Sequence, residues 1–421
     1  MKAYIIVLSI FLSTYVVAQT DTIIWQRLSP LPDTPRVDFG YFLIDSDFYI
    51  VGGENSATAY YSAVWRYNIP SDHWQRMRDF PGGPLTEALG FSLARNGYIC
   101  FGNDSLMGYN YDTEVWEYYP QTDTWLHKRN FPGGPRGGAN QSTFTYKGKA
   151  YIALDRSDYP DTWSYEPSAD LWDSLALFPA DSRYGPGLIQ KDSAAYFLGG
   201  FSTITNTEYR DIWRYDISTN KWDSIGVIPE LPNSTQLFWS LGNIAIGGFG
   251  DLEDTLGNHF FSRNCYSYSI DSSLWRNVVC TNFADTISNA ATFIYNKRAY
   301  CFGGYKNLPP NVSMYNEIWS FDASKFLSKD TTVGIQEVKN DYTFKAYPNP
   351  LDNQKTLHVQ CSEDGEIVFY DLLGRTTYQG AIHKGLNTFD CALLSCENRM
   401  ILYQAKMRNG RNESGKVVVV R

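Results

Sequence analysis

The chain has 421 residues, of which 16% are aromatic and only 19% are charged, and its formal net charge is −9 at pH 7. This composition excludes a disordered chain, which needs low hydrophobicity, and it argues against a nucleic-acid partner, whose phosphates require a basic surface. The many aromatic residues, together with 33 Gly and 19 Pro, favour short strands joined by tight turns.

The N-terminus has the pattern of a secretory signal peptide. Lys2 precedes an apolar run from Ile5 to Val17, and small residues lead to Ala18, after which we expect cleavage before Gln19. The run is too short for a membrane anchor, which needs about 20 apolar residues, and no other stretch is long enough to form a transmembrane segment. We therefore expect an exported protein.

Seven cysteines would enter an oxidising compartment. Cys100 and Cys301 occupy equivalent places before a glycine, and we expect both to be small buried strand residues. Cys265 and Cys280 flank an expected hairpin turn, so they can face each other, and a disulfide between them stays open. No cysteine spacing is typical of zinc.

Aromatic residues recur along the chain with a period of about fifty residues. The first four units each hold a tryptophan, a tyrosine two residues later and a second tryptophan seven residues beyond, as in Trp65, Tyr67 and Trp74, and the fifth has Tyr266 in the first place. Self-similarity at this period is typical of propellers and solenoids. The first unit is expected to hold four strands, near 39–44, 48–53, 63–68 and 73–78. The later tryptophans, with one ahead of the first unit, are Trp25, Trp74, Trp125, Trp172, Trp222 and Trp275.

A glycine pair such as Gly52-Gly53, then an aromatic residue, then a Tyr-x6-Trp pair resembles the kelch repeat, and the resemblance covers about 310 residues. It implies a six-bladed β-propeller over 19–328. The sixth unit has Trp319 but Ser328 where its second tryptophan would stand, whereas Trp25 lies ahead of the first unit. We therefore expect the N-terminal strand with Trp25 to form the outer strand of the last blade and seal the ring.

In a four-stranded antiparallel blade, the second-to-third and the blade-to-blade connections emerge on the same face. Aromatic rings with a few charged groups on that face suit carbohydrate or peptide binding. The ligand-binding candidates are Arg36, Tyr60, Glu87, Tyr109, Arg136, Arg183, Tyr209, His259 and Tyr305. For the arginines the resemblance implies a second interpretation, because an arginine after proline at this place in kelch repeats often only braces adjacent blades.

The sequence carries no catalytic or metal-binding motif. The loop 251–258 has several hard oxygen ligands that calcium would accept, but it lacks the EF-hand pattern and is better interpreted as a solvated acidic loop. Nucleophile-elbow, zinc-protease and phosphate-loop motifs do not occur. Five histidines cannot supply the copper radical site of the kelch-containing galactose oxidase. We expect no cofactor, no metal and no catalytic residue.

The C-terminal segment 342–421, which follows a polar linker over 329–341, shows the alternating pattern of a small β-sandwich. Its motifs resemble the type A sorting domain of the Bacteroidetes type IX secretion system: Tyr347, Pro348, Asn349 and Pro350, then Gly374 and Arg375, then Lys416 before an apolar strand. The resemblance implies the type IX machinery as a partner, passage through periplasm and outer membrane, and a secreted or cell-surface location. A generic adhesion β-sandwich is the alternative.

The expected fold class is all-β, a six-bladed kelch propeller followed by a small β-sandwich. The expected function is a non-catalytic binding module for a glycan or a protein. Two alternatives stay open: a carbohydrate-active enzyme of the kelch type, such as a sialic acid isomerase, and a structural surface protein without a small ligand.

Overall fold

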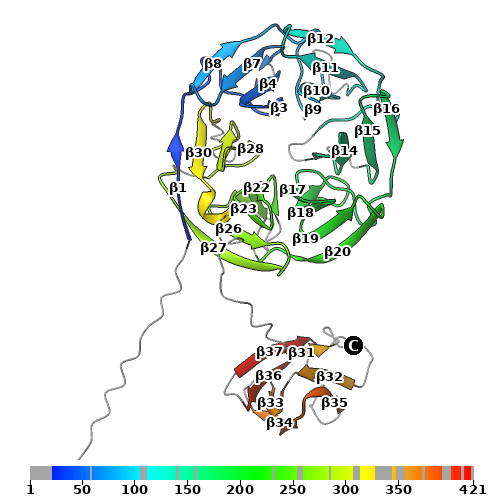
Figure 1. Cartoon of the computed structure of the whole chain (residues 1–421), viewed down its shortest axis with the longest axis vertical. Helices are drawn as coiled ribbons and strands as arrows, with labels where there is room; N and C mark the ends of the chain where they lie inside the picture. Colours follow the sequence, from blue (N-terminus) through cyan, green and yellow to red (C-terminus); the bar gives the residue numbers. More distant parts are fainter. Residues whose placement is uncertain are drawn as a thin grey trace, which may run out of the picture. The chain divides into compact units, whose positions relative to one another are not determined.

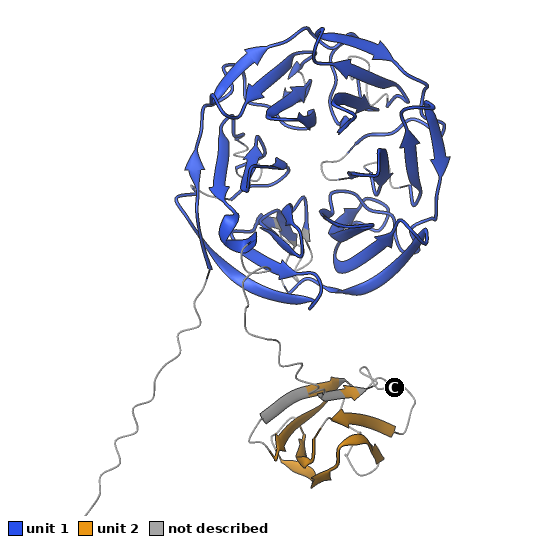
Figure 2. Ribbon diagram, in the orientation of Figure 1, with its two compact units in different colours: residues 1–332 blue, residues 333–421 orange. Residues whose placement is uncertain are grey.

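The structure is a computed structural model that describes residues 21–418 apart from 57–58, 105–110, 139–141, 156–158, 230–232, 254–258, 284–285, 307–312, 328–343, 348–355, 362, 372–374, 391–399 and 409–411. The chain divides into two compact units, residues 1–332 and 333–421 (Figure 2). The expected linker, 329–341, lies outside the described residues.

Six sheets of unit 1 are blades arranged around a central axis (Figure 1). In each blade the strands of the repeat unit follow one another outward from the innermost strand, and each runs antiparallel to its neighbour. Blade 1 is β3 (Gly40–Ile44), β4 (Asp47–Val51), β7 (Val64–Asn68) and β8 (His73–Arg76). Blade 2 is β9 (Leu89–Leu93), β10 (Asn96–Cys100), β11 (Val115–Tyr119) and β12 (Thr124–His127). Blade 3 is β13 (Thr143–Tyr146), β14 (Lys149–Ala153), β15 (Thr162–Glu166) and β16 (Leu171–Ser174).

The remaining blades follow the same plan. Blade 4 is β17 (Gly187–Lys191), β18 (Ala194–Ser202), β19 (Thr207–Asp216) and β20 (Lys221–Val227). Blade 5 contains β22 (Leu237–Leu241), β23 (Ile244–Gly248), β26 (Cys265–Ser269) and β27 (Leu274–Thr281). Blade 6 contains β28 (Ala291–Tyr295), β29 (Arg298–Phe302) and β30 (Ile318–Asp322), and helix α1 (Ser324–Leu327) follows it.

The N-terminal segment completes two blades. Strand β2 (Gln26–Arg27) pairs antiparallel with β30 and is the fourth strand of blade 6. Strand β1 (Asp21–Ile24) pairs parallel with β27 and gives blade 5 a fifth strand, which the repeat pattern did not predict. Between them Trp25 is buried against Trp239 and Phe321, with ring centroids 5.6 and 4.7 Å away. The ring is therefore closed by a segment that bridges its last two blades.

The Tyr-x6-Trp spacing has a physical cause in the turn between the third and fourth strands. In blade 3 the hydroxyl of Tyr165 donates to Asp170 Oδ1 at 2.7 Å, and Asp170 Oδ2 also accepts the backbone N–H of Arg129 from blade 2 at 3.1 Å. Asp170 has a φ of 51°, a region that aspartate and asparagine tolerate better than most residues. We call this pair of hydrogen bonds the latch. It recurs at Asp72, Asp123 and Asn220, and each of these side chains accepts a tyrosine hydroxyl and a backbone N–H from the neighbouring blade or the N-terminal segment.

The double glycine ends the second strand where two blades approach closely. Gly52 has a φ of +71°, and a Cβ atom there would lie 2.3 Å from the carbonyl oxygen of Leu85 in the connection to blade 2. Only glycine meets both conditions, because other residues rarely adopt this φ and would clash with the neighbouring backbone.

Unit 2 is built from two sheets. One has the order β31 (Phe344–Tyr347), β32 (Thr356–Cys361), β35 (Gly385–Asp390), and the other β34 (Thr376–Ile382), β33 (Gly365–Tyr370), β36 (Met400–Met407), β37 (Asn412–Val418). Leu357 and Val359 of the first sheet share a buried core with Ile367 and Phe369 of the second. The predicted fold class, a propeller followed by a small β-sandwich, is confirmed.

Candidate functional site

The long connections of unit 1 emerge on one face, which we call the loop face. It is formed by the connections between the second and third strands of each blade and by the blade-to-blade connections. Three of the long connections contain strands of their own. In blade 1, β5 (Glu54–Ser56) pairs with β6 (Ala59–Tyr60). In blade 5, β24 (Asp251–Glu253) pairs with β25 (His259–Phe261) of the same connection and with β21 (Asn233–Ser234) of the connection from blade 4.

The three candidate arginines lie inside the blades rather than on open surface. Arg36, Arg136 and Arg183 are 0%, 1% and 2% exposed. Arg136 Nη1 contacts Asp155 Oδ2 at 2.7 Å and Asp161 Oδ1 at 2.9 Å, while its Nη2 contacts Asp161 Oδ2 at 3.0 Å. Burial alone would lower the pKa of Arg136, but the hydrogen bonds and charges of the two aspartates outweigh it and raise the pKa. These guanidinium groups therefore act as braces and offer a ligand almost no accessible surface.

An aspartate beside each of these arginines also accepts a hydrogen bond from the first tryptophan of a repeat unit. Asp161 Oδ2 accepts the indole N–H of Trp163 at 2.7 Å, and Asp211 both pairs with Arg183 and accepts the indole N–H of Trp213 at 2.7 Å. The sequence pattern did not predict these acids. Their signal is an acidic residue two positions before the first tryptophan of a unit. In blade 1, Asp33 takes this role from the preceding connection, pairing with Arg36 at 2.6 Å and accepting the indole N–H of Trp65 at 3.1 Å.

Each brace carries one loop tyrosine. The Cζ atom of Arg183 lies 3.7 Å from the ring centroid of Tyr209, that of Arg36 lies 4.1 Å from Tyr61, and that of Arg136 lies 4.9 Å from Tyr159. Tyr159 is 43% exposed, and the other two are half-buried. We call these three rings, Tyr61, Tyr159 and Tyr209, the tyrosine platforms. A cation beneath an aromatic face is attractive and fixes the orientation of the ring.

Tyr209 is the candidate tyrosine that the structure places on a brace. Its hydroxyl donates to Asp181 Oδ2 at 2.7 Å, which adds a second restraint on the ring. Tyr60 lies half-buried in β6, and the neighbouring Tyr61 takes the place on Arg36. Tyr305 forms backbone bridges to Ser288 and Met314 at the entry to blade 6. Only the backbone of His259 is described, in β25, and Tyr109 lies outside the described residues, as do residues 254–258 of the acidic loop.

Glu87 belongs to a ring of residues with positive φ at the loop-face end of the channel. Its φ is 54°, its backbone N–H donates to Asp38 O at 2.6 Å, and its carbonyl accepts the N–H of Gly138 at 2.6 Å. Thr235 donates in the same way to Gly185 O at 2.6 Å. Between blades 6 and 1, Asn289 Nδ2 donates to Asp38 Oδ1 at 2.7 Å. The Glu87 carboxylate accepts a hydrogen bond from the hydroxyl of Tyr111 at 2.6 Å. Glu87 therefore bonds through its backbone to the neighbouring connections and through its side chain to the loop that holds Tyr111.

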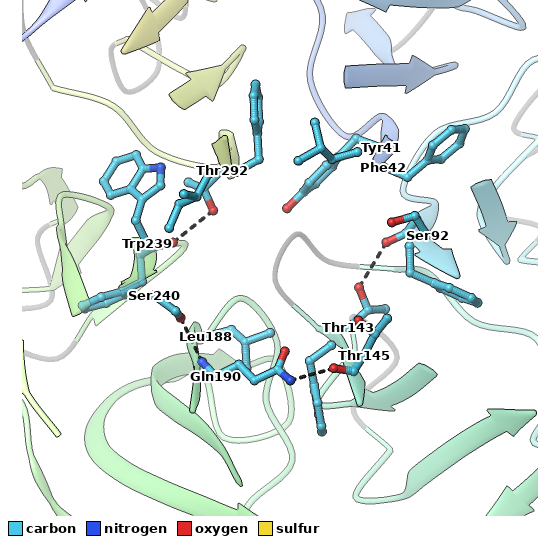
Figure 3. A pocket seen from close by; sticks show the side chains of 17 residues that line it. Tyr41, Phe42, Ser92, Thr143, Thr145, Leu188, Gln190, Trp239, Ser240 and Thr292 are labelled. Carbon is cyan, nitrogen blue, oxygen red and sulfur yellow. Dashed lines mark hydrogen bonds between the residues drawn. The ribbon is translucent and has the colours of Figure 1, made fainter. Parts of the chain in front are cut away.

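The central channel is a cavity of about 490 Å³ lined by the innermost strands of all six blades (Figure 3). Hydrogen bonds join neighbouring blades around it: Thr143 Oγ1 donates to Gly90 O at 3.1 Å and Thr292 Oγ1 donates to Phe238 O at 3.1 Å. Burial raises the pKa of Tyr41 to about 12, so this phenol stays neutral at ordinary pH. Within the described part of the chain, the channel lining contains no Asp, Glu, Lys, Arg or His.

The sorting-motif residues are described only in part. Tyr347 ends β31, and exposed Lys416 lies in β37. Arg375 Nε donates to Asp371 Oδ2 at 2.7 Å and its backbone N–H to Asp371 Oδ1 at 2.9 Å, which closes a tight connection between β33 and β34. Pro348, Asn349, Pro350 and Gly374 lie outside the described residues, and so do Ala18 and Gln19 of the expected cleavage site.

Cysteines and membrane spans add two findings. Cys100 and Cys301 are fully buried in the second strands of blades 2 and 6. Cys265 and Cys280 lie on adjacent strands with their thiols hydrogen-bonded to each other, and both are free thiols. Among the described helices none is long and apolar enough to cross a bilayer.

Comparison with known proteins supports this architecture. The model of the Kelch motif matches residues 35–81, which include all of blade 1. The solved structure described as "Structure of YjhT" is similar with a TM-score of 0.57 at 15% sequence identity, covering 69% of this chain and 96% of that one. No curated protein matches the sequence. The matched motif therefore marks blade 1 as a Kelch motif, and the shared fold shows that the ring of six blades in unit 1 is a β-propeller.

Proposed function

We propose that this chain is a secreted or cell-surface propeller that binds a glycan or a protein through its loop face without catalysing a reaction. Its C-terminal unit would serve as a type IX sorting domain that brings the propeller through the periplasm and outer membrane. The proposal for the propeller rests on the tyrosine platforms, and the proposal for unit 2 rests on the sequence motifs at 347–350, 370–375 and 416.

The tyrosine platforms support binding because each ring is held by a buried cation on one side. A guanidinium that is itself paired with an aspartate cannot move far, so the ring above it loses little entropy when a ligand stacks on it. Tyrosine offers a large apolar face and a polar tip, which suits the alternating C–H faces and hydroxyl edges of sugars as well as peptide surfaces. Three such rings on blades 1, 3 and 4 would give a multivalent surface.

Binding is tested with the mature chain, residues 19–421, on an array of glycans and surface proteins. We expect one class of ligand to be retained, with the affinity reduced at least tenfold in the triple variant Tyr61→Ala, Tyr159→Ala, Tyr209→Ala, because each stacking contact contributes about 1 kcal/mol. The matched control is Tyr146→Ala, which removes a tyrosine that contacts Lys147 beside the short turn between β13 and β14, away from the loop face. A blank array, or equal loss in the control, refutes the loop-face assignment, and turnover of a retained glycan refutes the non-catalytic part.

Delivery is tested separately in the native cell. A chain truncated after Asp341 should accumulate inside the cell envelope, whereas the full chain should reach the surface or the medium. Surface exposure of the truncated chain, measured by protease accessibility of intact cells, would remove the sorting role from unit 2 and leave the binding proposal untouched.

A further inference from the structure

The central channel contains a layer of side chains that the loop face does not explain. The fourth residue of five innermost strands, and its equivalent in β13, points into the cavity two residues after the layer that holds Tyr41 and Thr292. All six members of this layer are half-buried and line the cavity (Figure 3). We call this layer the channel belt, and its members in blade order are Leu43, Ser92, Thr145, Gln190, Ser240 and Ile294.

The channel belt is polar on one side and apolar on the other. Blades 2 to 5 contribute the polar residues Ser92, Thr145, Gln190 and Ser240, which follow one another around the ring. Blades 6 and 1, which are adjacent, contribute Ile294 and Leu43. A ligand at this level therefore meets hydrogen-bonding groups along about two thirds of its perimeter and two aliphatic side chains along the rest.

The polar side chains of the channel belt keep hydrogen-bonding capacity that the fold does not use. The hydroxyls of Ser92 and Thr145 have no hydrogen-bond partner within the described residues, in contrast to the hydroxyls of Thr143 and Thr292. Gln190 donates its Nε2–H to Thr145 O at 2.6 Å, which leaves the Oε1 acceptor facing the cavity. Ser240 Oγ accepts the backbone N–H of Gln190 at 2.9 Å, so its own proton remains available.

The electrostatics of the channel select for an uncharged ligand. The described lining has no ionisable carboxylate, amine, guanidinium or imidazole that could compensate a charge brought out of water. An unpaired buried charge costs several kcal/mol. The cavity volume of about 490 Å³ lies within the range of about 300–1,000 Å³ that is usual for small-molecule sites.

We propose that the channel belt binds a small neutral polyol with hydroxyls along one edge and an apolar C–H face, the chemistry of a neutral monosaccharide. The hydroxyl edge would face Ser92, Thr145, Gln190 and Ser240, and the C–H face would lie against Leu43 and Ile294. This site is separate from the tyrosine platforms, so it holds or fails independently of the loop-face function.

The test uses the mature chain and four probes: D-glucose, D-galactose, D-mannose and N-acetyl-D-glucosamine, with N-acetylneuraminate as the charged comparison. Saturation-transfer NMR detects binding, and titration calorimetry gives the affinity. At least one neutral probe should bind, and the double variant Ser92→Ala, Thr145→Val should weaken it tenfold or more, because each lost hydrogen bond reduces affinity about threefold to tenfold. The thermal midpoint should stay unchanged, because these hydroxyls have no described protein partner.

Two further variants distinguish a sugar site in the channel from one on the outer surface of the propeller. Ser92→Phe should fill the channel and abolish binding, whereas Thr22→Val, which repeats the Thr-to-Val change on outer strand β1, should leave the affinity unchanged. The loop-face triple tyrosine variant should also keep full affinity for the sugar. The proposal is overturned if no neutral probe binds, if the Ser92/Thr145 variant keeps wild-type affinity, or if N-acetylneuraminate binds as well as the neutral probes.

Discussion

Replacing Arg136 with methionine should destabilise the propeller strongly. The guanidinium is 1% exposed and pairs with two carboxylates, of which Asp155 is also 1% exposed. Methionine fills much the same volume without the charge. The Asp155 carboxylate would then lose its buried guanidinium partner, and removing one partner of a buried ion pair typically costs about 3–5 kcal/mol. We expect the free energy of unfolding of unit 1 to fall by that amount at pH 7.

The assay is urea denaturation followed by tryptophan fluorescence. All 12 tryptophans lie between Trp25 and Trp319, so the signal reports unit 1 alone. The matched control is Arg95→Met, because Arg95 also pairs with an aspartate, Asp45, but is 72% exposed. An exposed pair contributes about 0–1 kcal/mol, so this variant should unfold close to the wild type.

A double-mutant cycle distinguishes lost charge pairing from lost packing. In the background Asp155→Asn, Asp161→Asn, the change Arg136→Met should cost about 2 kcal/mol less than it does in the wild type, because no carboxylate then loses the charge of its guanidinium partner. If Arg136→Met costs no more than Arg95→Met, or if the neutralised background gives no relief, the interpretation of Arg136 as a buried electrostatic brace is refuted.

Three further outcomes follow from the structure. Burial raises the pKa of Asp112 to about 6, so the folded state binds a proton that the unfolded state releases, and the free energy of unfolding should rise as pH falls from about 7 to 4. Asp112→Asn should flatten this rise in urea melts from pH 4 to 8. An unchanged pH dependence in the variant would contradict the prediction. Tyr165→Phe should lower the free energy of unfolding by about 1–2 kcal/mol, because the hydroxyl loses its hydrogen bond to the Asp170 carboxylate. Tyr268→Phe should lower it less, because Ser273 stands in the place of the aspartate. Equal losses would show that the tyrosine–aspartate hydrogen bond does not stabilise the turn. Trp25→Ala should cost about 3–5 kcal/mol, against less than about 0.5 kcal/mol for its exposed neighbour in Ile24→Ala, and similar values would show that the closing segment contributes little.

The blades were predictable because their signals are local and repeated. A tyrosine seven residues before a tryptophan marks the turn that Asp170 latches, and Gly52 marks a contact that excludes every other residue. The parallel pairing of β1 with β27 was not predictable, because a strand of four residues outside the repeat has no internal copy to compare with. Its partner is fixed by tertiary contacts, chiefly the burial of Ile23 and Trp25 in the core that blades 5 and 6 share.

The site was harder to predict, because loop position does not determine exposure. Arg136 and Arg183 follow turn residues at the blade entry, and the sequence places them beside the loop face, yet acids such as Asp161 draw them inward. The channel belt was invisible for a different reason. Small polar residues such as Ser92 and Thr145 look like ordinary strand positions until six blades place them at one level.

The closing segment also fixes the order in which this protein can be completed. Residues 21–27 are among the first to be synthesised, but their partners in β27 and β30 lie about 250 to 290 residues further along the chain. Contacts of such long sequence separation form late, because closing the long intervening loop costs conformational entropy before the contact stabilises the fold. Before β30, which ends at Asp322, has been synthesised, we expect the ring to be open between blades 5 and 1. We therefore expect the ring to close in one late step, in which the N-terminal segment pairs with blades 5 and 6.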